Sequence, residues 1–244
     1  MGLELWLVWA GVSVVGAVLA LDDTGLAQTW FSQPLPAALL VGLVAGDPAA
    51  ALVPGMCMQL MVLGNLPVGA ASTLDATSAT VGVVGGALVA GFSLPTSSSL
   101  LSVWSQDTGA QVGLMLVLMA LVSHGAGHLV ALQRRNHLVW KLAVYREIRD
   151  GRFAVVGGLH RRALALTAAR GAAVSLLVAV LVAMAWRPLL TALPARLLEI
   201  LALAPLLTVP LAVGSLSERH GHRRAAPVLL VTVALGALMS WRLL

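Results

Sequence analysis

The stretch GLVAGDPAAALVPGMCMQLMVLGNLPVGAASTLD, residues 42–75, decides the fold because it sets polar and helix-breaking residues inside an apolar chain. The apolar segments at 36–46 and 48–64 are too short or too interrupted to cross a bilayer, which takes about 20 helical residues. Irregular backbone is tolerated at membrane depth only where protein or a wet cavity satisfies it. We therefore predict a re-entrant or broken-helix hairpin around residues 34–75. Its shape would be set by Asp47, Pro54, Gly55, Gly64 and Gly69.

The composition of the whole chain is that of an all-α integral membrane protein. Of 244 residues, 59% are hydrophobic and 10% are charged, whereas a soluble domain carries about 25% charged residues. We expect about six to seven transmembrane helices in one membrane domain that comprises residues 1–244. The single cysteine excludes an internal disulfide framework. The apolar segments outside the hairpin are 5–21, 76–92, 112–132, 171–186, 197–216 and 225–241.

Charges are segregated along the chain. Residues 1–133 contain no Lys or Arg, and nine of the fifteen basic residues lie between 134 and 170. A basic run flanked by membrane spans marks a cytoplasmic loop, because positive charge stays on the inner side, and it does not require nucleic acid as a partner. We predict such a loop at 134–170. Within it, the spacing of Trp140, Val144 and Ile148 leaves open an interfacial helix or a solvated linker.

Polar side chains in the first third of the chain are candidates for binding a hydroxylated solute. An amide in hydrocarbon costs several kcal/mol, roughly, unless it is partnered. Sugar hydroxyls donate and accept together, and amides and carboxylates match that pattern. For Gln59 the alternative is a bond that joins two helices, and Asp47 has the sequence context of a helix N-cap. The predicted substrate-binding residues are Asp22, Gln28, Gln59, Asn65 and Asp75.

The chain shows little sign of catalytic chemistry. His124 and His128 are one helical turn apart, but the residues between them lack the glutamate of the H-E-x-x-H zinc motif. There is also no G-x-x-x-x-G-K-[ST] phosphate loop. We expect no catalytic residue, no metal and no cofactor. An intramembrane metal-dependent hydrolase is a remote alternative.

Short motifs follow one another through residues 5–186 in an order typical of one family. They are Asp22, Pro34-Leu35, GLVAGD ending at Asp47, Gly55, Gln59, Leu63-Gly64, VGA at 68–70, Asp75, DGRFAVVGGLH at 150–160 and Arg170. In this order they resemble the IIC membrane subunit of the mannose/fructose/sorbose family of the bacterial sugar phosphotransferase system.

The resemblance implies a permease subunit in the bacterial inner membrane and not an enzyme in its own right. A IIC subunit binds the hexose, pairs with a second membrane subunit, IID, and is expected in a trimer of IIC–IID pairs. Phosphoryl transfer to the sugar belongs to the cytoplasmic IIB (IIAB) subunit. A regulatory or sensor relative that binds sugar without transporting it is the alternative.

Overall fold

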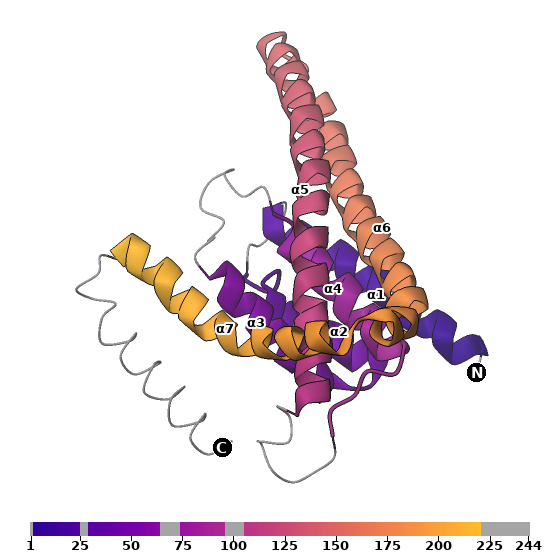
Figure 1. The fold of residues 1–244 in the computed structure, drawn as a ribbon. Coiled ribbons are helices and arrows are strands. Elements are labelled where there is room, and N and C mark those ends of the chain that lie inside the picture. Colours follow the sequence, from indigo (N-terminus) through magenta and orange to yellow (C-terminus); the bar gives the residue numbers. More distant parts are fainter. Residues whose placement is uncertain (1, 25–28, 64–73, 96–104, 221–244) are drawn as a thin grey trace.

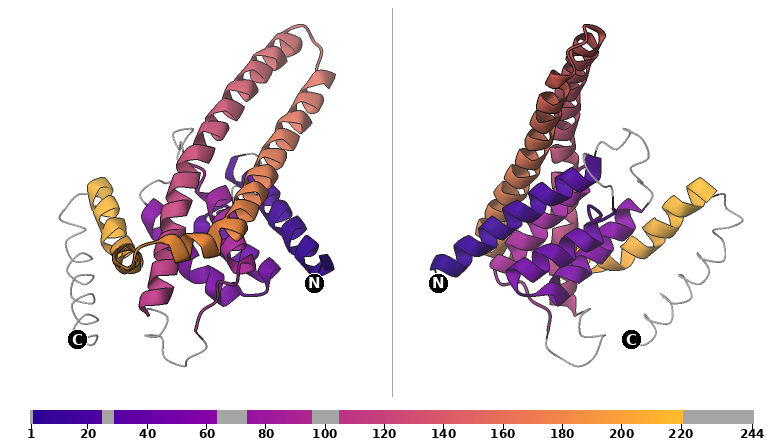
Figure 2. Two further views of the ribbon diagram at one scale, coloured as in Figure 1. Left: turned by 45° about the vertical axis from the view of Figure 1, so that its right-hand side comes forward. Right: turned by 180° about the vertical axis from the view of Figure 1, so that it is seen from behind.

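The computed structural model describes residues 2–24, 29–63, 74–95 and 105–220, and its regular secondary structure in these ranges is all helix. Four helices are long and apolar enough to cross a membrane, and three shorter apolar helices lie among them. The predicted all-α membrane architecture is confirmed. Figures 1 and 2 show the arrangement. The helices are α1 (Gly2–Thr24), α2 (Pro34–Ala45), α3 (Pro48–Val62), α4 (Ala76–Val89), α5 (Gln106–Arg149), α6 (Ala154–Ala192) and α7 (Ala195–His220).

The predicted hairpin is formed by α2 and α3. Their 12 and 15 residues correspond to about 18 and 22 Å of helix, which is less than the thickness of a bilayer core. Gly46 ends α2 with φ of 85°, a left-handed conformation that favours glycine. Asp47 then caps α3 by accepting a hydrogen bond from the backbone N–H of Ala50 at 3.0 Å. The chain thus turns back between two short helices.

Pro54 and Gly55 do not interrupt α3, contrary to the sequence prediction, because α3 continues through both residues. Gly55 instead allows close packing of the hairpin. A methyl group at Gly55 would lie 2.3 Å from the Cβ of Ala38 on α2. Gly55 therefore lets the two short helices pack closely, and α3 is not broken at this point.

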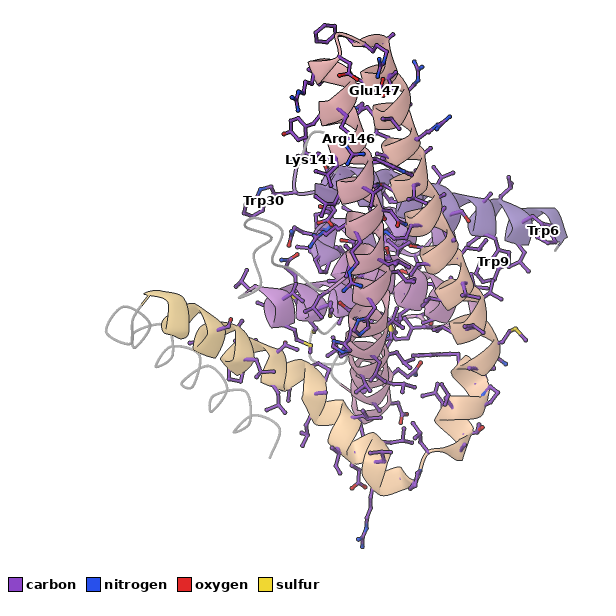
Figure 3. All side chains as sticks on the ribbon, turned by 90° about the horizontal axis from the view of Figure 1, so that it is seen from above. Trp6, Trp9, Trp30, Lys141, Arg146 and Glu147 are labelled. Carbon is purple, nitrogen blue, oxygen red and sulfur yellow. The ribbon has the colours of Figure 1, made fainter. Side chains whose placement is uncertain are left out.

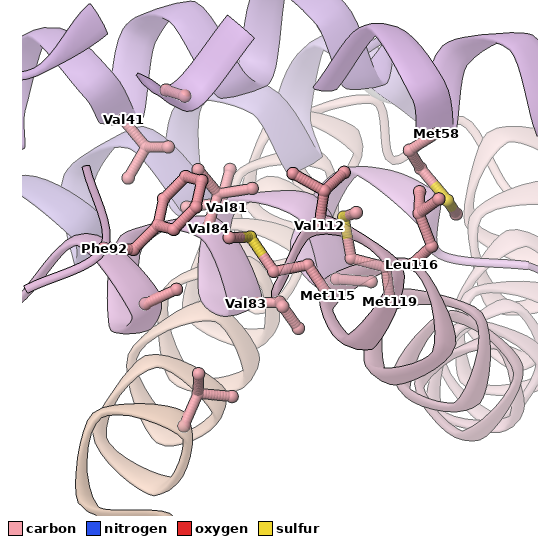
Figure 4. Close-up of a cluster of buried hydrophobic side chains, with 14 of the residues drawn as sticks. Val41, Met58, Val81, Val83, Val84, Phe92, Val112, Met115, Leu116 and Met119 are labelled. Atoms are coloured by element: carbon pink, nitrogen blue, oxygen red, sulfur yellow. The ribbon is translucent and has the colours of Figure 1, made fainter. Parts of the chain in front are cut away.

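The centre of the molecule is α4, which packs against α1, α2, α3, α5 and α6. All of its residues from Thr77 to Ala87 are buried. It has only 14 residues, so the helix in the apolar segment 76–92 is shorter than a full membrane span. Its chain turns away at Gly91, where φ is 98°. Figure 4 shows α4 valines meeting Val112, Met115 and Met119 of α5 in the core.

The basic segment predicted at 134–170 is helical, because α5 and α6 run through it, and its location on the cytoplasmic side stays a prediction. Residues 134–149 contain no Gly or Pro and are rich in helix-forming Arg, Leu, Lys and Ala, so nothing ends α5 there. The turn between the helices is made at Gly151, whose φ is 78°. The result is a basic helical hairpin, α5–α6, that projects from the rest of the molecule (Figures 1 and 2).

The outer faces of the helices are apolar. Side chains such as Val14, Leu121, Leu181 and Met184 are mostly exposed, as expected for surfaces that meet lipid tails. Figure 3 shows Trp6 and Trp9 on α1 well away from the charged residues of the projecting hairpin. The apolar segment at 225–241 lies outside the described residues.

We predict that Gly86→Ala lowers the free energy of unfolding by about 1–3 kcal/mol, the usual cost of overpacking. A methyl group there would lie 2.4 Å from the backbone oxygen of Ala179 on α6. Gly125→Ala is the matched control, because a methyl group at Gly125 meets nothing within 4 Å. Thermal unfolding in detergent should separate the two variants. Equal stability would show that α4 and α6 are not packed this closely.

Candidate functional site

The polar site begins at Asp22, a buried residue near the end of α1. Its Oδ1 accepts hydrogen bonds from the backbone N–H and the hydroxyl of Thr29, at 2.8 and 2.7 Å. Its Oδ2 accepts the backbone N–H of Ser32 at 3.0 Å. One carboxylate thus folds the segment 29–33 against α1. The same segment contains Trp30, whose φ of 72° marks a tight turn.

Gln59 reaches this segment from α3. Its Nε2 donates to Oε1 of Gln33 at 3.1 Å, and its Oε1 accepts the backbone N–H of Leu35 at 3.4 Å. Leu35 lies in the first turn of α2, where backbone N–H groups have no partner within the helix. The half-buried amide therefore joins the far end of α3 to the start of α2.

Asp75 stands at the start of α4 and has two roles. One oxygen caps the helix by accepting the N–H of Ser78 at 3.0 Å, and the other pairs with Nη1 of Arg170 on α6. Only 6% of the Asp75 side chain and 9% of the Arg170 side chain are exposed, so this ion pair is buried. The backbone N–H of Asp75 also donates to the carbonyl of Ser123 on α5, at 3.0 Å.

A single hydroxyl connects these two parts of the site. The Thr77 hydroxyl on α4 donates to the backbone carbonyl of Ser32, whose own N–H is bound by Asp22. Two of the predicted residues, Asp22 and Gln59, therefore bind the segment 29–35, and Asp75 lies two residues before Thr77, which binds the same segment.

On the other side of Asp75, the network continues into α5. Nε of Arg170 donates to Oε1 of Gln133 at 2.6 Å, and Nε2 of Gln133 donates to the hydroxyl of Thr167. Gln133 and Thr167 are buried. A guanidinium that bonds a carboxylate and an amide at once is held rigidly, because its planar donors fix both directions. We call the connected set from Gln59 to Thr167 the polar network.

The remaining predicted residues have different outcomes. Gln28, Asn65, Gly64 and Gly69 lie outside the described residues. Sequence reasoning did not assign a site role to the network members Ser32, Gln33, Thr77, Gln133, Thr167 and Arg170. A usable signal did exist for Arg170, since a buried arginine needs an acid and Asp75 was available. The threonines gave no comparable signal.

The network can bind and orient a polar solute, but it is poorly equipped for bond breaking. It consists of carboxylates, amides, hydroxyls and a guanidinium that already pairs with Asp75. Among the described residues, no group of three His, Cys, Asp or Glu side chains could hold a metal ion. Short helices that carry polar groups to membrane depth characterise multi-pass membrane proteins that bind solutes, and the described part of the chain fits this class.

Comparison with known proteins defines the family. A family model described as the sorbose-specific IIC component of the PTS system matches residues 6–215, so the chain belongs to this family, as its motifs predicted. A curated relative, the PTS system sorbose-specific EIIC component of Lacticaseibacillus casei, is 29% identical over 181 residues. That match spans 74% of this chain and 57% of the relative.

Solved structures share the fold. One, described as a membrane protein, has a TM-score of 0.65 at 23% identity and is matched over 99% of this chain and 94% of its own. Another, the mannose transporter ManYZ in complex with microcin E492, has a TM-score of 0.50 at 23% identity, over 98% of this chain and 86% of that one. These likenesses show a common helical architecture.

We predict that Arg170→Gln destabilises the protein by about 3–5 kcal/mol, because the Asp75 carboxylate would be left buried without its counter-charge. The double variant Asp75→Asn, Arg170→Gln should regain part of this loss. Thermal unfolding of the two single variants and the double variant, as a double-mutant cycle, measures the coupling.

Arg152→Gln is the control for this cycle. Arg152 pairs with Glu147 at 2.6 Å, but its side chain is 57% exposed. Water replaces such a partner readily, so we expect no change in the unfolding temperature. If Arg152→Gln lowered the stability as much as Arg170→Gln, the distinction between the exposed and the buried ion pair would be contradicted.

Proposed function

We propose that this protein is the sugar-binding and translocating IIC subunit of a mannose/fructose/sorbose-type phosphotransferase system. It carries a hexose across the bacterial inner membrane, and the cytoplasmic IIB subunit phosphorylates the sugar as it emerges. The family supports a membrane subunit of this system. The observation that carries the proposal is the placement of Gln59, a half-buried amide from a short apolar helix, in the polar network.

Gln59 is suited to exchange partners with a sugar. Its bonds to Gln33 and Leu35 are ordinary neutral hydrogen bonds, at 3.1 and 3.4 Å. Replacing one such bond by a bond to a hydroxyl changes the free energy little, since one hydrogen bond is exchanged for another. A sugar hydroxyl can accept from Nε2 and donate to Oε1, which an aliphatic solute cannot do.

The carboxylates retain capacity for the same solute. Asp22 accepts three hydrogen bonds from the chain, whereas a carboxylate offers about four lone-pair sites. Its Oδ2 carries one of these bonds and can accept a hydroxyl as well. Asp75 contributes to the proposed sugar site indirectly, because its carboxylate fixes the position of Arg170. Gln28 and Asn65 remain proposed contacts on the same solute.

The proposal includes protein partners. As a IIC subunit the chain pairs with IID in the membrane, as a trimer of such pairs, and receives IIB from the cytoplasm. The α5–α6 hairpin supplies a basic surface for that encounter, with Arg135, Lys141, Arg146 and Arg149 exposed on α5. Figure 3 shows Lys141 and Arg146 on this hairpin. Positive charge at this end also supports a cytoplasmic location for it.

We predict that Gln59→Leu weakens hexose binding by at least about tenfold, the order expected when one polar contact to the sugar is lost. Calorimetry on the complex copurified with IID should be run with mannose, fructose, sorbose and an amino sugar. Gln106→Leu is the matched control, because Gln106 is exposed at the start of α5. Unchanged binding in Gln59→Leu would remove this residue from the sugar site.

We predict that the tip of the α5–α6 hairpin is reached only from the cytoplasm. Cys57 is the only cysteine and is buried, so a Cys57→Ala background allows single labels. Arg149→Cys should react with a membrane-impermeant maleimide in inverted vesicles and not in intact cells. Ser105→Cys, at the opposite end of α5, should show the reverse. Labelling of Arg149→Cys in intact cells would overturn the orientation.

A further inference from the structure

A cavity of about 200 Å³ lies between α5 and α6, where the projecting hairpin leaves the helical core. Its walls combine three aliphatic side chains with polar groups from both helices. The polar groups are Gln133, Arg134 and His137 on α5, and His160, Thr167 and Arg170 on α6. On α5 they repeat at helical spacing, so they line one face of that helix.

The lining is rich in hydrogen-bond donors. Two guanidiniums and two imidazoles face a space whose described lining residues include no carboxylate. The acids nearby stand behind it: Asp75 is paired with Arg170, and Asp23 is close enough to both arginines to interact with them electrostatically. These acids attract the arginines from behind, so the cavity itself is lined, among the described residues, by hydrogen-bond donors and not by carboxylates.

A second observation points to a ligand. Nε2 of His137 is buried and finds no hydrogen-bond partner among the described residues. The ring is held against Trp140, with centroids 5.6 Å apart. An unsatisfied buried nitrogen costs about 1–3 kcal/mol, and a ligand in the cavity toward which the ring turned would remove this cost.

We propose that this cavity binds a phosphate group. Arginine recognises phosphate through charge-assisted hydrogen bonds, and imidazole and hydroxyl groups can donate to the remaining phosphate oxygens. The volume is below the 300–1,000 Å³ or so of pockets for drug-sized ligands, which suits a small anionic group. The group comes either from an anionic lipid headgroup or from a phosphorylated sugar, and only the second source rests on the proposed function.

The cavity shares one wall with the polar network. Gln133, Thr167 and Arg170 belong to both, since they line the cavity and are joined by the hydrogen bonds of the network. Arg134 and His160 line the cavity and are not members of the polar network as defined above. Their replacement leaves every residue of that network in place.

The test uses the full chain with its membrane partner. Calorimetry in neutral detergent measures binding of inorganic phosphate and of mannose 6-phosphate. Native mass spectrometry measures retained phosphatidylglycerol after release from phosphatidylcholine nanodiscs that contain it. We expect Arg134→Gln to weaken binding of one of these probes by about tenfold, the order for one charge-assisted hydrogen bond.

The matched control is Arg135→Gln, since Arg135 is the exposed neighbour that does not line the cavity. His160→Gln is a second disruptive variant; His160 is exposed, so its replacement leaves the fold intact, and Arg161→Gln is its control. Selective loss of the soluble probes identifies the sugar-phosphate source. Selective loss of phosphatidylglycerol identifies the lipid.

The proposal is overturned if no probe binds, or if each disruptive variant behaves like its control. Binding of unphosphorylated hexose is measured on the same samples and should be unchanged by Arg134→Gln. Hexose binding without phosphate binding would contradict the phosphate site but would remain consistent with the proposed function. If the unmodified protein does not bind hexose, that result instead counts against the proposed function.

Discussion

The buried ion pair between Asp75 and Arg170 is the interaction on which the rest of the structure depends. It joins residues 95 positions apart and ties the first turn of α4 to the middle of α6. Removing either charge leaves the other in a medium of low dielectric, which is far more costly than never having buried them. Gln133 holds the guanidinium from α5, so three helices are fixed at one point.

Short helices create the need for such anchors. A helix that ends inside a membrane protein leaves backbone N–H groups without water or helical partners. The chain satisfies them with side chains at each interior start: Asp47 for α3, Asp75 for α4 and Gln59 for α2. The same groups that permit short helices thereby bring carboxylates and amides to membrane depth. In the proposed function, capping and solute binding would draw on one set of residues.

Much of this could be predicted from the sequence. The run from 42 to 75 predicted the hairpin, because Gly46, Asp47 and Pro48 form a helix stop followed by a cap and a start. For 134–170 the sequence left a helix and a solvated linker open, since the positive-inside rule concerns the side of the membrane and not the conformation. A basic segment without Gly or Pro from 134 to 149 is better interpreted as a continued helix.

The contacts of Gln133 and Thr167 could not be predicted for a different reason. They meet across 34 residues and two helices, and only the rotation of α5 against α6 brings them together. Short-range spacing carries no information about that rotation. Where the sequence contained a local cause, as at Asp47, the prediction was confirmed; where the cause was tertiary, as at Thr167, there was nothing local to detect.

Glycines set the distance at which these tertiary contacts can form. Gly82 and Gly86 of α4 lie against the backbone of α6, and Gly16 of α1 lies against Gly171, next to Arg170. A methyl group at Gly171 would stand 2.3 Å from the carbonyl oxygen of Gly16, so even alanine would push these helices apart. Wider spacing would lengthen the Asp75–Arg170 pair, and its attraction falls with distance while its desolvation cost stays. Small residues between helices are therefore a condition for the charges at the site.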